Sequence, residues 1–297
     1  MIEKLVPSSV IREKFRQNLK SGTLQRLPGV FSPLTARLAE IFGFEGLYLS
    51  GATLSAEMGL PDIGLATATE FCSKARILCD STTMPLIADM DTGFGEPVQV
   101  ARTVRLAEQA GLTGIHIEDQ LTIKRCGHLD HKKLVTPEQM AQKVKTAVQA
   151  RSDPNFLIIA RTDARGSEGL NQATDRARQY IDAGADAIFP EALESVKEFE
   201  TFRESVPSPL LANMTEFGKS PLLDTQTLQN LGFNMVIWPV TLLRLALKAM
   251  EAGLKTLKNQ GHQQTLLPAM MTRKELYKLL CYDDYERYDQ DITNFKL

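Results

Sequence analysis

The stretch GLTGIHIED, Gly111–Asp119, begins with a glycine-led turn, continues through a short apolar run and ends in acidic residues. Similar phrases occur at Gly43–Gly46, Gly184–Ala187 and Gly232–Met235. Glycine in the first position can adopt the left-handed conformation that ends a helix, after which the chain turns directly into a strand. The recurring phrase therefore predicts a series of helix-to-strand units.

Short apolar runs alternate with segments of helical period from about Gly29 to Ala252. This alternation is typical of parallel strands covered by helices. The predicted strands are Val30–Phe31, Gly46–Leu49, Leu86–Ala88, Gly114–Ile117, Leu157–Ala160, Ala187–Phe189, Leu210–Ala212 and Met235–Ile237. Eight such strands predict an α/β fold of the (β/α)8 TIM-barrel type. An open doubly wound sheet would use the same alternation and is the alternative.

Beyond Ala252 the pattern changes to polar helical segments at Thr272–Cys281 and Asp284–Thr293. These extra C-terminal helices exceed what a barrel needs. They can pack on their own barrel or on a neighbouring subunit. We expect residues 1–297 to form a single barrel domain that includes this helical tail, about residues 253–297.

Composition excludes several classes of protein. The 297 residues carry 34 Lys and Arg against 36 Asp and Glu, a net charge of −2, so nucleic acid and membrane surfaces are not expected partners. No apolar run approaches the roughly 20 residues of a membrane helix. The four cysteines form no Cys-x-x-Cys pair, and the N-terminus lacks the apolar core of a signal peptide. We expect a cytoplasmic protein with a small, soluble ligand.

Polar side chains follow nearly every predicted strand. In a barrel of this type the reactive groups lie at the C-terminal ends of the strands. The residues there are Ser32, Tyr48, Ser50, Gly51, Asp89, Asp91, His116, Glu118, Asp119, Arg161, Asp163, Glu191, Asn213 and Thr215. Their density at one end predicts an active site in the barrel mouth.

Three of these acids predict a metal site. The strand period of two places Asp89 and Asp91 on one side, and likewise His116 and Glu118. Carboxylates this close repel one another unless they are protonated or bridged by a cation. Mg²⁺ suits oxygen ligands and keeps sites open for a chelating substrate, and Mn²⁺ is a possible substitute. For any single acid the alternative is a salt bridge or a helix cap, which we favour for Asp119 and Asp163.

The segment Leu121–Val135 is longer than the usual two to six residues of such connections, and long loops over an active face are often lids. Lys124, Arg125 and His128 surround Cys126 in this segment. Neighbouring cations lower the pKa of a thiol, so Cys126 could transfer a proton near neutral pH. A solvated basic loop with an incidental cysteine is the alternative.

Seven motifs carry a family resemblance that spans almost the whole chain. They are YLSGATLSAEMGLPD (Tyr48–Asp62), DMDTGFG (Asp89–Gly95), HIEDQ (His116–Gln120), KRCGH (Lys124–His128), ARTDA (Ala160–Ala164), FPEA (Phe189–Ala192) and ANMTEFG (Ala212–Gly218). In this order they resemble the isocitrate lyase/phosphoenolpyruvate mutase superfamily. The Cys-Gly-His sequence and the chain length resemble its short C–C lyases.

The resemblance implies Mg²⁺-dependent cleavage of the tricarboxylate 2-methylisocitrate to pyruvate and succinate. It also implies a barrel whose eighth helix is exchanged between paired subunits, in a homotetramer. Cleavage of isocitrate, 2,3-dimethylmalate or oxaloacetate on the same frame is the nearest alternative. A catalytically silent barrel that binds a dicarboxylate is a more distant one, and a substrate panel separates the three.

The same resemblance assigns roles to residues. Expected metal ligands are Asp89, Asp91 and Glu118. Expected catalytic residues are Cys126, His128, Lys124, Tyr48 and Asp62. Expected substrate-binding residues are Ser50, Gly51, Ala52, Arg125, Gly127, Arg161, Glu191, Asn213 and Thr215. Cys126 would protonate the carbon of the departing fragment, whereas the base that removes the hydroxyl proton is Tyr48, Asp62 or a carboxylate acting through water. Ala52 stands where the family often has glycine.

Overall fold

The computed structural model describes residues 6–122, 124–125, 127–128 and 131–294. This part of the chain contains eight strands, all in parallel pairing. They are β1 (Gln25–Pro28), β2 (Leu47–Leu49), β3 (Leu86–Asp89), β4 (Gly114–Glu118), β5 (Leu157–Thr162), β6 (Ala187–Pro190), β7 (Leu211–Asn213) and β8 (Met235–Trp238).

The strands form two sheets, one in the order β2-β3-β4-β5-β6 and the other in the order β1-β8-β7. An isolated parallel bridge joins Gly29 to Tyr48, and another joins Ile188 to Leu210, so the sheets meet at both of their edges. The amide of Val30 donates to the carbonyl oxygen of Tyr48 at 2.9 Å, and the amide of Ile188 donates to Pro209 at the same distance. The predicted α/β fold with parallel strands is confirmed.

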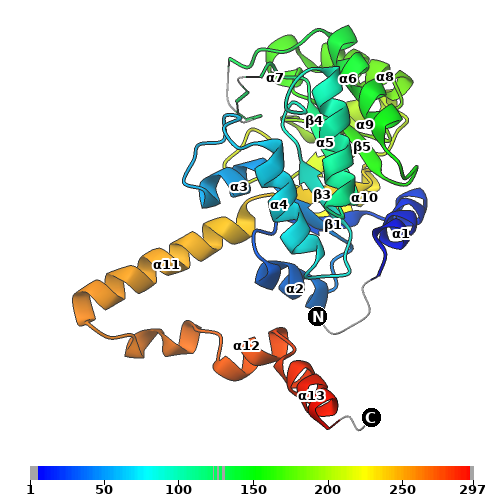
Figure 1. The fold of residues 1–297 in the computed structure, drawn as a ribbon. Helices are drawn as coiled ribbons and strands as arrows, with labels where there is room; N and C mark the ends of the chain where they lie inside the picture. Colours follow the sequence, from blue (N-terminus) through cyan, green and yellow to red (C-terminus); the bar gives the residue numbers. More distant parts are fainter. Residues whose placement is uncertain (1–5, 123, 126, 129–130, 295–297) are drawn as a thin grey trace.

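Helices follow most strands and cover the outside of the sheets (Figure 1). They are α1 (Ser8–Lys20), α2 (Pro33–Ile41), α3 (Gly51–Glu57), α4 (Ala68–Cys79), α5 (Pro97–Gln109), α6 (Pro137–Ala150), α7 (Arg165–Glu168), α8 (Leu170–Asp182), α9 (Val196–Ser205), α10 (Thr225–Asn230), α11 (Thr241–Gln260), η1 (Gln264–Ala269), α12 (Arg273–Leu279) and α13 (Tyr282–Thr293). None of the described helices is long and apolar enough to span a membrane.

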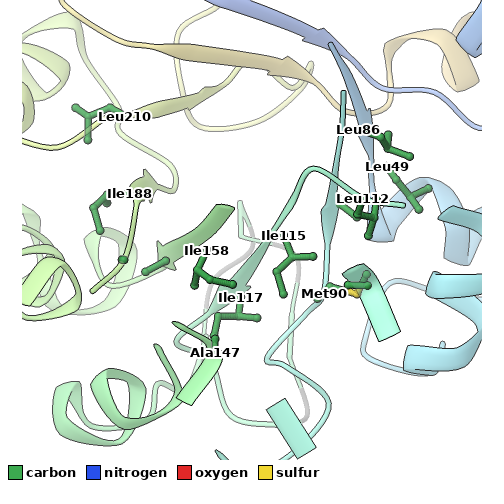
Figure 2. Packing of buried hydrophobic residues seen from close by; sticks show 14 of the residues in the cluster. Leu49, Leu86, Met90, Leu112, Ile115, Ile117, Ala147, Ile158, Ile188 and Leu210 are labelled. Atoms are coloured by element: carbon green, nitrogen blue, oxygen red, sulfur yellow. The ribbon is translucent and has the colours of Figure 1, made fainter. Parts of the chain in front are cut away.

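Two apolar cores hold this arrangement together. The larger lies between the strands and the covering helices, where Ile115, Ile117 and Ile158 pack with Ala147 of α6 (Figure 2). The smaller lies on the opposite face of the strands and includes Phe15 of α1. Strand side chains alternate between these cores, as the period of two requires. Helix α1 thus contributes apolar side chains to the inner core, a role that the sequence pattern did not predict.

The first predicted strand was wrong in position. It was expected at Val30–Phe31, but β1 is Gln25–Pro28 and lies just before it. This strand begins with two polar residues, so the sequence shows no apolar run at this position. The Nε atom of Arg26 donates to the Glu45 carboxylate at 2.8 Å, and Gln25 is buried with its side-chain amide on the carbonyl of Thr23. Because Arg26 and the Gln25 amide nitrogen have hydrogen-bond partners, a strand forms here without an apolar run, although Gln25 Oε1 is buried with no partner among the described residues.

The C-terminal segment leaves the body of the protein. Figure 1 shows α11 extending away from the strands, and η1, α12 and α13 leading back toward α2. Helix α11 has no buried residue among those described, and the side chains of Leu245 and Leu254 are 64% and 68% exposed. Arg37 of α2 donates to the carbonyl of Leu279 at 3.0 Å, so α12 is tied to the body.

Candidate active site

A pocket of about 90 Å³ opens at the carboxyl ends of the strands. Most of the side chains predicted from the sequence line it together. These are Tyr48, Ser50, Ala52, Asp62, Asp89, Lys124, Arg125, Gly127, His128, Arg161, Glu191, Asn213 and Thr215. Among the described residues, Gly51, Asp91 and Glu118 do not line it, and Cys126 lies outside the described residues.

The acids expected to bind metal surround a lysine. The Nζ atom of Lys124 lies 2.5 Å from Asp62 Oδ1 and 2.6 Å from Asp91 Oδ1. Asp91 has a left-handed backbone, φ 47°, because β3 ends at Asp89 and the chain turns there. The expectation that Asp91 continues the strand alternation was therefore wrong. The turn nevertheless brings it to Asp89, whose Oδ1 accepts the Asp91 amide at 2.9 Å.

The electrostatics of this group indicate a missing positive charge. Burial, helped by the neighbouring Asp89, raises the pKa of Asp91 to about 7. Burial also raises the pKa of Glu118 well above its ordinary value. Among the described residues neither carboxyl oxygen of Glu118 has a hydrogen-bond partner, and its nearest cation is Arg161, with Nε 3.4 Å from Oε2. Buried acids without partners are costly unless a cation accompanies them.

A hydrated magnesium ion fits this donor set. The three acids offer oxygen atoms alone, which Mg²⁺ prefers, and Mg²⁺ commonly retains several of its waters. Within the described ranges no three His, Cys, Asp or Glu side chains converge closely enough to enclose a metal ion.

Tyr48 and His116 form a buried pair beside these acids. The Tyr48 hydroxyl lies 2.7 Å from His116 Nε2, and the two rings stack at 5.8 Å. Burial lowers the pKa of His116 to about 4, so the imidazole is neutral at pH 7. Burial raises the pKa of Tyr48 well above its ordinary value. At rest, both groups are uncharged.

Arg161 is the central cation of the pocket. It makes two hydrogen bonds to Asp163, at 3.0 and 3.1 Å, and its Nη2 lies 3.2 Å from Glu191 Oε2. Its guanidinium also lies over the ring of Phe189, 5.0 Å from the centroid. Arg161 is thus fixed in orientation before any ligand binds. The expectation that Asp163 serves in a salt bridge is confirmed.

His128 is held between a loop and an acid. The amide of Lys219 donates to His128 Nδ1 at 3.0 Å, which leaves the ring proton on Nε2, 3.1 Å from Glu191 Oε1. The Asn213 amide donates to both Glu191 oxygens, at 3.3 and 3.2 Å. Burial opposes ionisation of Glu191, but Arg161 and His128 outweigh it and lower its pKa. Glu191 therefore remains an anion that organises three donors.

Gly51 lies in contact with an acid of the site. It begins α3 and its amide donates to Asp89 Oδ2 at 3.3 Å, so this N–H is occupied by an acid of the site. A side chain at Gly51 would lie 2.8 Å from the same oxygen. Glycine is needed here for close approach to Asp89. Ser50 lines the pocket and caps α3 by accepting the Thr53 amide.

Several pocket residues escaped the sequence analysis. They are Phe189, Ile237, Val240 and Arg244. Arg244 lies in the first turn of α11, where its Nη1 is 2.7 Å from the carboxylate of Glu216. The sequence feature that could have identified Arg244 is its position, since it is the first basic residue after the last strand.

Comparisons with known proteins show relatives that match almost the whole chain. The sequence model of the family described as phosphoenolpyruvate phosphomutase matches residues 15–258. The chain is 50% identical to a probable 2-methylisocitrate lyase 1 of Corynebacterium glutamicum, covering 96% of this chain and 94% of that protein. It is 46% identical to the 2-methylisocitrate lyase of Halalkalibacterium halodurans, covering 99% and 97%.

Solved structures share the fold. Oxaloacetate acetylhydrolase with the inhibitor 3,3-difluorooxalacetate is 34% identical, with a TM-score of 0.91 over 98% of this chain and 99% of that one. Phosphonopyruvate hydrolase in complex with oxalate and Mg²⁺ is 29% identical, with a TM-score of 0.86 over 98% and 99%. By its sequence and its fold, this chain belongs to the phosphoenolpyruvate mutase/isocitrate lyase superfamily.

Proposed function

We propose that this protein is a carbon–carbon lyase that cleaves 2-methylisocitrate to pyruvate and succinate. The observation that carries the proposal is full-length identity of 46–50% to 2-methylisocitrate lyases, joined to a pocket in which the expected polar groups meet. Lys124, Arg125, His128, Arg161 and Arg244 all line this pocket. Such a set of basic side chains suits a substrate with three carboxylates.

The reaction can be followed through the residues of the chain. The proton leaves the hydroxyl on C2, the C2–C3 bond breaks, and its electron pair moves into the departing fragment as pyruvate forms. Asp62 in the pocket can receive the hydroxyl proton, and the neutral Tyr48 can do so by passing its own proton to His116, whose Nε2 lies 2.7 Å from the Tyr48 hydroxyl. The fragment leaves as a doubly charged aci-carboxylate, and a proton on its carbon completes succinate.

Hydrogen-bond donors with fixed positions would stabilise that charge. Preorganised donors placed where charge develops are often the largest catalytic term. Arg161 and Asn213 are held in place by Glu191, and Thr215 lines the same wall. We assign the final proton to Cys126, whose neighbours Lys124 and Arg125 would favour the thiolate when the proton has left.

Magnesium would be held by Asp89, Asp91 and Glu118, with Asp62 nearby. It would act as a Lewis acid on the α-hydroxy acid and lower the pKa of the hydroxyl group. The complex of phosphonopyruvate hydrolase with Mg²⁺ and the unpartnered Glu118 oxygens support this assignment.

A panel of substrates tests the proposed reaction. We expect kcat/KM for 2-methylisocitrate to exceed the values for isocitrate, 2,3-dimethylmalate and oxaloacetate. One methylene in an apolar pocket changes selectivity by only about 1–3 kcal/mol, so all four must be measured. A higher value for another substrate would reassign the enzyme within the superfamily. Binding without turnover of any of the four would favour a catalytically silent barrel.

For the architecture, we propose one closed barrel domain with a helical tail, whose eighth barrel helix, α11, is exchanged between two subunits of a homotetramer. The two bridges between the sheets support closure. Exposed apolar side chains along α11, including Leu247 and Leu254, support burial against another subunit. The free thiols of Cys72, Cys79 and Cys281 are compatible with the reducing cytoplasm, where we place the protein.

A further inference from the structure

The loop that joins β4 to α6 is held by two side chains that lie outside the pocket lining. The first is Gln120, which follows β4 and is 1% exposed. Its Nε2 donates to the carbonyl of Arg125 at 2.8 Å, and its Oε1 accepts the Arg125 amide at 2.9 Å. This double hydrogen bond fixes the backbone immediately before position 126.

The second side chain is Lys132, which is 8% exposed. Its Nζ donates to the carbonyl of Gly127 at 2.5 Å and to Asp163 Oδ1 at 3.1 Å. Asp163 is the carboxylate that holds Arg161 through two hydrogen bonds. Lys132 therefore fixes the backbone immediately after position 126 and ties it to the partner of the central cation.

Backbone hydrogen bonds join the two ends of the loop, close to the residues that carry both side chains. The amide of Leu121 donates to Lys133 at 2.9 Å, and the amide of Val135 donates to Asp119 at 2.9 Å. These bonds close the stem of the loop, with Gln120 on one side and Lys132 on the other. Hydrogen bonds to the backbone of a loop restrict where its side chains can lie, and catalytic groups depend on such support.

We propose that Gln120 and Lys132 are positioning residues that fix the backbone of Arg125 and Gly127, two residues of the pocket lining on either side of position 126. This rests on the proposed lyase function. Neither residue lines the pocket that the described residues form, so both act through Arg125 and Gly127. A displacement of about 1 Å in a reacting group can cost about 100-fold in rate.

The test compares Gln120→Leu and Lys132→Met with Lys133→Met in the full-length protein. Lys133 is exposed, and its replacement by methionine removes the same charge one residue away from Lys132. The readouts are kcat and KM for 2-methylisocitrate and hydrogen–deuterium exchange of peptides covering residues 121–135. We expect kcat to fall about 100-fold in the first two variants, with little change in KM and faster exchange. Lys133→Met should match the wild type in all three.

Wild-type kcat and exchange in both test variants would overturn the inference. So would a loss of kcat without faster exchange, because it would mean a direct chemical role. If either variant fails to fold, Gln120→Glu and Lys132→Arg replace them, with smaller changes in the same direction expected and no change overturning the inference. If the wild type does not cleave 2-methylisocitrate, the proposed function fails, while the exchange comparison still tests the two anchors.

Discussion

The Nζ atom of Lys124 lies 2.6 Å from Oδ1 of Asp91, so the nearest positive charge to this acid comes from the segment Leu121–Val135 between β4 and α6. Lys124 also pairs with Asp62. Burial would lower the pKa of the lysine, but Glu118, Asp89 and Asp91 together raise it well above its ordinary value. One lysine shared among these acids leaves the group short of positive charge, which a divalent cation would supply.

Removal of metal should therefore abolish activity. We expect EDTA to stop pyruvate formation and added Mg²⁺ to restore it. Mg²⁺ should also raise the melting temperature, since a ligand at 100 times its dissociation constant stabilises the folded state by about 2.7 kcal/mol. Asp91→Asn should weaken this stabilisation, and the exposed Asp182→Asn should not. Undiminished activity in EDTA would disprove the metal assignment.

The sequence predicted most of this site because each polar group directly follows an apolar strand. Asp89, Arg161 and Asn213 lie where the strand ends place them. Asp91 could not be placed this way, because its position depends on a left-handed turn that the strand period does not describe. Arg244 was missed because it belongs to α11, and no apolar run ends beside it.

Core packing and local pairing explain the remaining differences in the fold. Helix α1 was not predicted because its apolar residues Phe15 and Leu19 are few. Their role becomes visible only in the fold, where they pack into the smaller apolar core. Arg12 of this helix is buried, with Nε donating to the carbonyl of Leu112 at 2.8 Å. The sequence shows a polar N-terminal segment, and only tertiary contacts show that one face of this helix is buried.

Gly127→Ala should damage catalysis through steric contact. A Cβ there would lie 2.3 Å from Arg161 Nη2 and 2.4 Å from Glu191 Cγ, and the ion pair between these two residues prevents either from yielding easily. We expect kcat/KM to fall about 100-fold, because the loop must shift. Gly166→Ala is the control, since its Cβ would make an ordinary contact of 3.5 Å. Steady-state kinetics of both variants test this prediction. Equal values of kcat/KM in Gly127→Ala and Gly166→Ala would show that the loop accommodates the extra methyl group.

Cys126→Ser should reduce turnover while the protein stays folded. Positioned proton transfer contributes about 10²- to 10⁴-fold, and a serine hydroxyl is a far weaker acid than a thiol. Cys281→Ser is the control, because that thiol is exposed in the C-terminal tail. Pyruvate formation and circular dichroism are the measurements. Near-normal turnover in Cys126→Ser would remove the thiol from the mechanism.

Replacing apolar side chains on α11 should weaken assembly. Leu247, Met250, Leu254 and Leu257 follow helical spacing, and each is between 47% and 68% exposed. Burying a leucine contributes about 1.5–3 kcal/mol, so Leu247→Glu combined with Leu254→Glu should dissociate the oligomer. Sedimentation velocity measures the change, with the exposed Lys258→Ala as control. A monomeric wild type would contradict both the swap and the tetramer.

Asp119 should make folding stability depend on pH. It accepts hydrogen bonds from Thr162, Asp163 and Tyr180, yet burial and the nearby Asp163 carboxylate raise its pKa to about 6. The folded state therefore binds this proton more tightly than the unfolded state, where an aspartate has a pKa of about 4. The resulting stabilisation is complete below about pH 4 and is lost as the pH rises through 6.

Asp119→Asn removes the titratable carboxyl group. A comparison of wild type and variant therefore isolates the effect of this group on the pH dependence of stability. Between pH 4 and pH 7 the free energy of unfolding of the wild type should fall by about 2 kcal/mol relative to the variant. The asparagine keeps an acceptor for the Asp163 amide, and the hydroxyl groups of Thr162 and Tyr180 can rotate to accept from its amide. Urea unfolding at several pH values measures the difference, with Asp182→Asn as the exposed control. A difference that stays constant across this range would mean that Asp119 does not titrate there.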